Sequence, residues 1–80
     1  MLNTYDQIYD DVKQSYENLR TLFNLDEFDF GQEKLEVYKQ CSDVSIFLQV
    51  KYPNTDNQEI ITAIINFNTA LDKFSLNITN

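Results

Sequence analysis

Apolar residues recur along the first quarter of the chain at intervals of three and four positions, with polar residues between them. The members of this stripe are Leu2, Tyr5, Ile8, Tyr9, Val12, Tyr16, Leu19, Leu22 and Phe23. A spacing near 3.6 residues places such side chains on one face of an α-helix. Asp6 near the start and Arg20 near the end stand in the order that the helix dipole favours. The pattern predicts a helix over residues 4–23.

A second helical stripe follows Pro53. Its members are Ile60, Ile61, Ile64, Phe67, Leu71 and Phe74, with Ala63 and Ala70 on its flanks. Thr55 and Asp56 are both suitable N-caps, because each precedes a Gln or Glu by three positions. We expect a helix from there to about Ser75, followed by a tail without a pattern.

The middle of the chain has a different pattern, in which apolar and mostly polar residues alternate. The alternating apolar residues are Leu35, Val37, Val44, Ile46, Leu48, Val50 and Tyr52. Alternation with β-branched residues is typical of a strand with one buried face. A turn at residues 40–43 would pair the two runs as an antiparallel hairpin with its apolar residues on one face. Residues 26–30 also alternate and could add a third strand.

Together these elements predict an α+β fold. It consists of a helix, a two- or three-stranded antiparallel β-meander and a second helix, with both helices on one face of the sheet. The alternative is a three-helix bundle, in which residues 32–52 form one helix that ends before Pro53. In such a helix the same apolar residues would spread around the whole circumference, so we favour the strands. No repeat or linker divides residues 1–80, which we expect to form a single domain.

Composition narrows the chemistry that the chain can perform. The 80 residues hold 13 Asp and Glu, six Lys and Arg, one Cys, one Gly and no His, for a formal net charge of −7. Without His, and with Cys41 alone, there is no Cys/His zinc site, disulfide or His-based triad. No Asp or Glu lies within an apolar stripe, where burial could raise its pKa for acid–base catalysis. We therefore expect a protein that is not an enzyme and has no catalytic residues, cofactor or metal.

The acidic balance also bears on the partners of the protein. Direct DNA or RNA binding is not expected, because that affinity comes mainly from Lys and Arg meeting phosphates. Five acidic residues crowd into one stretch of eleven: Asp26, Glu27, Asp29, Glu33 and Glu36. Such carboxylates could occupy the basic groove of a nucleic-acid-binding protein by mimicking nucleic acid. A solvated face that keeps the protein soluble is the simpler interpretation.

Two aromatic residues offer a second candidate surface. In the predicted hairpin, Tyr38 and Phe47 point away from the buried face and lie diagonally across the two strands. An outward aromatic pair with a polar rim is typical of the centre of a protein–protein interface. The alternative is that a loop, the tail or a second copy in a homodimer covers this face.

The start of the chain lacks the basic and apolar segments of a signal peptide, and no apolar run approaches the roughly 20 residues of a membrane span. One unpaired cysteine fits a reducing compartment. These features favour a cytoplasmic protein that does not interact with a membrane.

The predicted order of helix, strands and helix resembles a double-stranded-RNA-binding domain in outline. Where that family has basic residues, at the start of its last helix, this chain has Asp56-Asn57-Gln58-Glu59, so RNA binding is not implied. In size, acidity and mixed layout the chain is similar to several phage-encoded inhibitors, including some anti-CRISPR proteins and DNA mimics. We expect a small acidic inhibitor of this phage or mobile-element anti-defence type, which binds a basic, nucleic-acid-handling protein. The alternative is an adaptor, subunit or immunity-type protein that binds through the aromatic sheet face.

Overall fold

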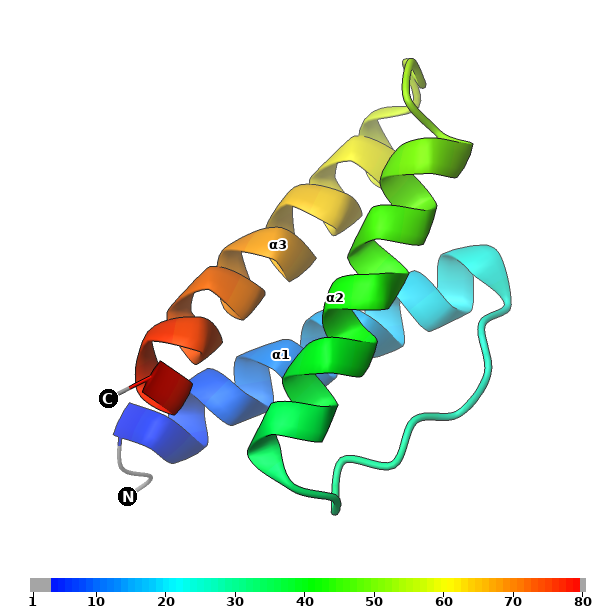
Figure 1. Cartoon of the computed structure of the whole chain (residues 1–80). Helices are drawn as coiled ribbons and strands as arrows, with labels where there is room; N and C mark the ends of the chain where they lie inside the picture. The colour runs from blue at the N-terminus through cyan, green and yellow to red at the C-terminus, as the bar shows by residue number, and fades with distance from the viewer. Residues whose placement is uncertain (1–3, 80) are drawn as a thin grey trace.

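The computed structural model describes residues 4–79, with side chains from 6 to 78, and consists of three α-helices joined by two loops (Figure 1). Helix α1 spans Thr4–Phe23, α2 spans Lys34–Lys51 and α3 spans Gln58–Thr79. No strand occurs among residues 4–79. The fold is all-α, so the predicted α+β meander is wrong. The chain instead resembles a bundle of three helices, the arrangement weighed as the alternative.

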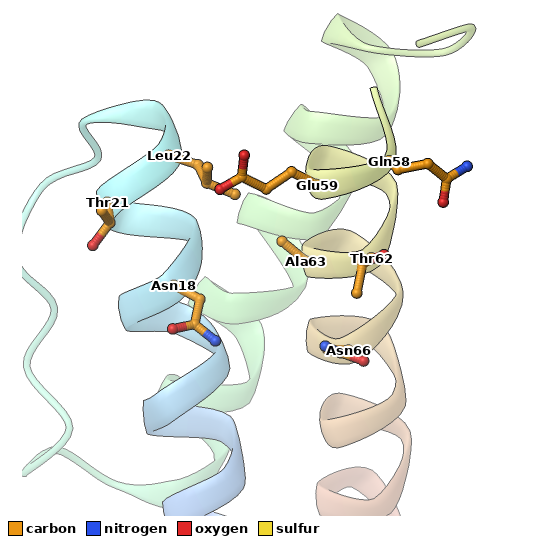
Figure 2. Close-up of a pocket in the computed structure, with 8 residues that line it drawn as sticks. All are labelled: Asn18, Thr21, Leu22, Gln58, Glu59, Thr62, Ala63 and Asn66. Carbon is orange, nitrogen blue, oxygen red and sulfur yellow. The ribbon is translucent and has the colours of Figure 1, made fainter. Parts of the chain in front are cut away.

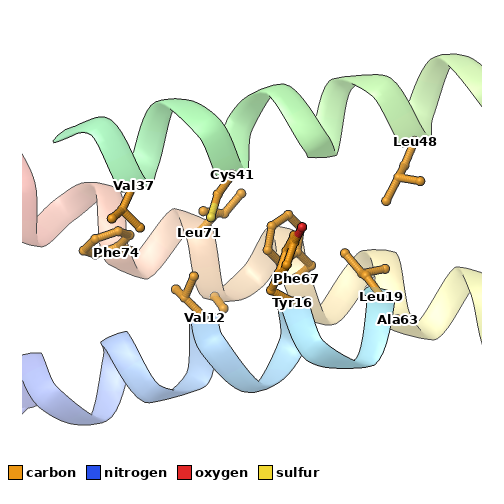
Figure 3. Packing of buried hydrophobic residues seen from close by; sticks show 11 residues of the cluster. Val12, Tyr16, Leu19, Val37, Cys41, Leu48, Ala63, Phe67, Leu71 and Phe74 are labelled. Carbon is orange, nitrogen blue, oxygen red and sulfur yellow. The ribbon is translucent and has the colours of Figure 1, made fainter. Parts of the chain in front are cut away.

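Helix α3 packs against both other helices. The start of α1 lies beside the end of α3 (Figure 1), where the ring centroids of Tyr9 and Phe74 are 5.5 Å apart. Over their described lengths, α1 and α2 have no pair of Cα atoms within 8 Å of each other. Side chains fill the space between them. Figure 3 shows Val12 and Tyr16 of α1 and Val37 and Cys41 of α2 directed into one core.

The core contains most of the described residues of the stripes predicted for the first and last helices, but not Ile60 and Ile61, which are half-buried outside it. Its buried apolar members are Val12, Tyr16, Leu19, Val37, Cys41, Leu48, Ala63, Phe67, Ala70, Leu71 and Phe74 (Figure 3). Phe67 and Phe74 are fully buried, and each buried aromatic removes about 150–250 Å² from water. The side chains of Leu2 and Tyr5, also assigned to the first stripe, lie outside the described residues.

The ends of the helices agree only in part with the sequence prediction. Helix α1 has the predicted bounds, whereas α3 continues past Ser75 to Thr79, so the patternless tail is wrong over these residues. The N-cap of α3 is Asn57, not Thr55 or Asp56. Its side-chain oxygen accepts hydrogen bonds from the N–H groups of residues 59 and 60, at 3.0 and 3.4 Å.

Residues 34–51, predicted as a hairpin, form the single helix α2. Its buried side consists of Val37, Cys41, Ser45 and Leu48, at spacings of four, four and three. This is the helical period, but Cys41 and Ser45 are small and contribute little to an apolar pattern. The alternation in the sequence arises because Ile46 and Val50, on the opposite side of the helix, are apolar although they are exposed.

Tertiary contacts explain why the helix forms despite the β-branched residues. The strand preference of such residues spans only about 1 kcal/mol and changes with context. Helix α2 instead lies along α3, where the Ser45 hydroxyl donates a hydrogen bond to the side-chain oxygen of Asn68. The expected turn at residues 40–43 contains no Gly, Asn or Pro to break the helix. Residues 26–30, the possible third strand, lie in a loop.

Over the described residues, none of the three helices combines the length and the apolar character needed to cross a membrane.

Candidate protein-binding surfaces

Most of the acidic residues predicted to bind a partner lie in the loop between α1 and α2, residues 24–33, which we call the acidic loop. The loop starts at Asn24, whose φ of 54° lies in the left-handed region that Asn tolerates better than most residues. The N–H of Leu25 donates to the carbonyl oxygen of Arg20 at 3.4 Å. This geometry ends α1 and turns the chain toward the core.

Two phenylalanines fasten the acidic loop to α1. The ring centroid of Phe28 lies 5.3 Å from that of Tyr16. The Phe30 centroid lies 5.9 Å from that of Tyr16 and 6.0 Å from that of Tyr9. The Tyr16 hydroxyl also donates to the carbonyl oxygen of Asp26 at 2.7 Å, and the Tyr9 hydroxyl donates to the carbonyl of Phe30. The backbone of the loop is therefore held at two points by α1.

The alternation of residues 26–30 separates buried from exposed side chains, although no strand forms. Phe28 and Phe30 are half-buried against the core. Asp26, Glu27 and Asp29 are exposed, and the Glu27 side chain is 87% exposed. The structure thus presents three carboxylates on a loop whose aromatic side chains anchor it.

Two of these carboxylates also have partners within the chain. Arg20 lies 3.5 Å from Glu27 and 3.4 Å from Glu17, measured between side-chain nitrogen and oxygen. Exposed ion pairs of this kind contribute at most about 1 kcal/mol. The Asp29 carboxylate accepts a hydrogen bond from the N–H of Gly31 at 2.8 Å, as in an Asx turn. Asp29 therefore shapes the loop as well as adding charge to it.

The other two predicted acids continue the acidic surface onto the start of α2. Glu33 is the N-cap residue, and its side chain makes no capping hydrogen bond. Glu36 is in the first turn and lies 3.9 Å from the Lys39 ammonium. Negative charge at a helix N-terminus stabilises the helix by about 0.3–1 kcal/mol, so both residues also have a structural role.

The structure does not bring the predicted aromatic pair together. Tyr38 and Phe47 are nine residues apart on α2, which places them about half a turn apart around the helix and about 14 Å apart along it. Tyr38 is half-buried, with its ring centroid 6.4 Å from that of Phe74. Phe47 is 52% exposed, and the Lys51 ammonium lies 5.5 Å from its ring centroid. With no sheet over residues 4–79, the aromatic sheet face does not exist.

A surface that the sequence reasoning missed lies on the side of α2 that faces away from the core. Ile46, Phe47 and Val50 form this outer face, with exposed fractions of 58%, 52% and 74%. Residues three and four apart are neighbours on a helix, so Val50 lies beside both Phe47 and Ile46 and the three side chains form one apolar patch. The sequence itself indicates this patch, because a helix over the middle segment has apolar residues around its whole circumference and cannot bury all of them against one neighbour.

An open groove of about 510 Å³ separates the end of α1 from the start of α3 (Figure 2). It is lined by Asn18, Thr21, Leu22, Gln58, Glu59, Thr62, Ala63 and Asn66. Five of the eight lining residues carry an amide or a hydroxyl group, and Figure 2 shows the single carboxylate, that of Glu59, extending toward Leu22. This lining can form hydrogen bonds with a polar ligand. Among the described residues no group of three His, Cys, Asp or Glu is placed to hold a metal ion.

The one cysteine lies in the core and not in the predicted turn. Cys41 is fully buried, and burial raises the pKa of its thiol from the usual 9.0 to about 12. The thiol therefore stays protonated and unreactive at neutral pH.

Burial of Cys41 predicts that the protein loses stability in alkaline solution. The unfolded thiol ionises near pH 9 and the folded one near pH 12, so stability is complete below pH 9 and falls as the pH rises between these values. At pH 10.5 the loss is about 2 kcal/mol. Urea unfolding at pH 8 and 10.5 measures it, with Cys41→Ala as the comparison.

We expect the change between the two pH values to be smaller in Cys41→Ala by about 2 kcal/mol. Burial, which Tyr16 experiences in both proteins, is the main cause that raises its pKa, and this part cancels in the comparison; the smaller part due to the Cys41 charge is lost together with the thiol. The same pH dependence in both proteins would contradict a buried thiol.

Comparison with known proteins gives no further assignment: no family model matches the chain, and neither does a curated protein or a solved structure.

Proposed function

We propose that the protein is a small, non-enzymatic inhibitor that binds a basic, nucleic-acid-handling protein through its acidic loop. The observation that carries the proposal is the division of the loop into two sides. Phe28 and Phe30 hold it against α1, while Asp26, Glu27 and Asp29 are exposed. Glu33 and Glu36 extend the same charge onto the first turn of α2.

Anchoring matters because a fixed loop loses little conformational freedom on binding. A flexible acidic tail would have to be ordered when it meets its partner, at a cost of roughly 1–2 kcal/mol for each residue. The two tyrosine hydrogen bonds to the carbonyls of Asp26 and Phe30 favour a backbone that is already ordered. The carboxylates are then presented in a defined arrangement, as an imitation of a phosphate backbone requires.

The distribution of charge supports the same surface. Residues 24–33 contain four carboxylates and no Lys or Arg, whereas α2 contains three Lys and two carboxylates. The negative charge of the protein is thus concentrated at the loop. A basic partner would be steered toward this side of the molecule, and the rate of association would fall as salt is added. We place this interaction in the cytoplasm, where nucleic-acid-handling partners of this kind are found.

The experiment compares two double variants that make the same change of charge in different places. Asp26→Lys with Glu27→Lys reverses two exposed charges in the loop without removing an aromatic anchor. Asp56→Lys with Asp72→Lys reverses two exposed charges in other parts of the chain. The partner is first isolated from the host with the tagged wild-type protein. The purified partner is then titrated with each variant and with a fluorescent DNA duplex as competitor.

We expect the loop variant to bind at least about tenfold more weakly, and the matched variant to bind within about threefold of wild type. Wild-type affinity should also fall steeply between 50 and 300 mM salt, and the protein should displace the DNA duplex from its partner. If both variants bind like wild type and salt has no effect, the acidic loop serves only solubility and the proposal fails.

A further inference from the structure

Helix α2 is apolar on two opposite sides, although the structure covers only one of them. Its inner side packs into the core through Val37, Cys41 and Leu48. Its outer face exposes Ile46, Phe47 and Val50. A helix with apolar residues all around is typical of one that is buried on all sides. In Figure 1, α2 lies on the outside of the molecule, and no other described element covers that face.

We propose that the outer face of α2 is the interface of a homodimer. In it, the α2 helices of two copies pack antiparallel about a two-fold axis near Phe47. The inference does not depend on the proposed inhibitor function, because it concerns a different surface of the protein.

The arrangement of charge around the patch points to a second copy as the occupant. Asp43 lies four residues before Phe47, and Lys51 lies four residues after it. An antiparallel partner with its axis at Phe47 therefore brings Asp43 opposite the partner's Lys51, and Lys51 opposite the partner's Asp43. A two-fold interface requires such self-complementarity. Within residues 4–79, the Asp43 carboxylate forms no ion pair.

Helical geometry allows these residues to interlock. Asp43, Phe47 and Lys51 follow one another at intervals of four, which makes them one ridge on the surface of α2. Ile46 and Val50 form the neighbouring ridge, also at an interval of four. Two such helices can pack with the ridges of one in the grooves of the other, at a crossing angle of about −50°. The Lys51 ammonium already lies at the edge of the patch, over the Phe47 ring.

The overall charge favours α2 over the other surfaces for self-association. Two copies of a protein with a net charge of −7 repel each other. Helix α2 holds three of the six Lys and Arg but only two of the 13 Asp and Glu, so repulsion is weakest where two α2 helices meet.

The size of the patch sets the strength of the dimer. Ile46, Phe47 and Val50 supply less than half of the roughly 800 Å² that each partner contributes to a stable interface. The aliphatic parts of Lys39 and Lys51 add to this area. We expect a reversible dimer with a dissociation constant on the order of 10–100 μM.

Sedimentation equilibrium of the full chain between about 1 and 500 μM tests the proposal. The average mass of the wild type should rise from 9.5 kDa toward twice that value. Val50→Lys, at the most exposed residue of the outer face, should weaken association at least about tenfold. Leu76→Lys makes a matched change at a residue of α3 that is 63% exposed, and it should associate like wild type. Circular dichroism confirms that each variant is folded.

Charge reversal tests the antiparallel arrangement itself. Asp43→Lys alone and Lys51→Asp alone each place like charges opposite each other twice, so each should weaken the dimer about tenfold. The double variant restores both pairs with their signs exchanged and should return to within about threefold of wild type. A mass that stays at 9.5 kDa at every concentration, a dimer unaffected by Val50→Lys, or a double variant without recovery would each overturn the proposal.

Discussion

Replacing Leu48 with Asp is expected to unfold the protein, whereas the same replacement two positions earlier, at Ile46, leaves it folded. Leu48 is 1% exposed and lies in the core, so an Asp there would be a charge without a partner. The cost is several kcal/mol, comparable to the roughly 3–5 kcal/mol that one core supplies in a chain of this size. Ile46 is 58% exposed, and a charge at that position stays in water.

Far-UV circular dichroism and urea unfolding of both variants give the measurement. Wild type and Ile46→Asp should show the same helical spectrum, with stabilities within about 1 kcal/mol of each other. Leu48→Asp should show a spectrum of an unfolded chain even without urea. Residues two apart face the same side of a strand but different sides of a helix. Unfolding of both variants would therefore contradict helix α2.

Replacing Tyr16 with Ala is expected to cost about 3–5 kcal/mol, which leaves a large fraction of the molecules unfolded at 25 °C. The Tyr16 side chain is 3% exposed. Its ring centroid lies 6.1 Å from that of Phe67 in α3 and 5.3 Å from that of Phe28 in the acidic loop. Loss of the ring therefore removes contacts both within the core and between the core and the loop.

Tyr16→Phe is the control, because it keeps the ring and removes only the hydroxyl that donates to the carbonyl of Asp26. It should cost about 0.5–1.5 kcal/mol by urea unfolding. Limited proteolysis reports on the loop separately, and cleavage within residues 24–33 should be faster in Tyr16→Phe than in wild type. Equal stability of Tyr16→Ala and Tyr16→Phe would show that the ring does not anchor the loop.

Helices α1 and α3 illustrate what a local pattern can predict. In α1, apolar residues such as Val12 and Leu19 occur on one side only, and the bounds of the helix follow from their spacing. In α3, Phe67 and Phe74 mark the buried stripe, although Ile65 and Leu76 are exposed outside it. A clear apolar stripe at the helical period predicts a helix whichever other elements of the fold pack against it.

Helix α2 shows the opposite case. Val37 and Leu48 on one side, and Ile46 and Val50 on the other, satisfy both a helical and an alternating pattern. The small buried residues Cys41 and Ser45 conceal the helical stripe. The choice between helix and hairpin depends on α3, which offers a long apolar surface and the Asn68 side chain for Ser45. No pattern within residues 34–51 contains that information.

The two binding surfaces predicted from the sequence differ in the same respect, since one depends on the fold and the other does not. The acidic stretch from Asp26 to Glu36 can be read from the sequence, because charge belongs to residues whatever their fold. The grouping of Tyr38 with Phe47 cannot, because it depends on whether the backbone repeats every two residues or every 3.6.

The net charge of −7 and its concentration before α2 are thus properties of the chain alone, as is the lack of His-based chemistry. The anchoring of the acidic loop by Tyr9 and Tyr16 and the exposure of Ile46, Phe47 and Val50 arise from the folded arrangement. The physical reason is that burial is a relation between distant segments. A residue in α2 becomes core or surface only when α3 takes its place beside one side of the helix and not the other.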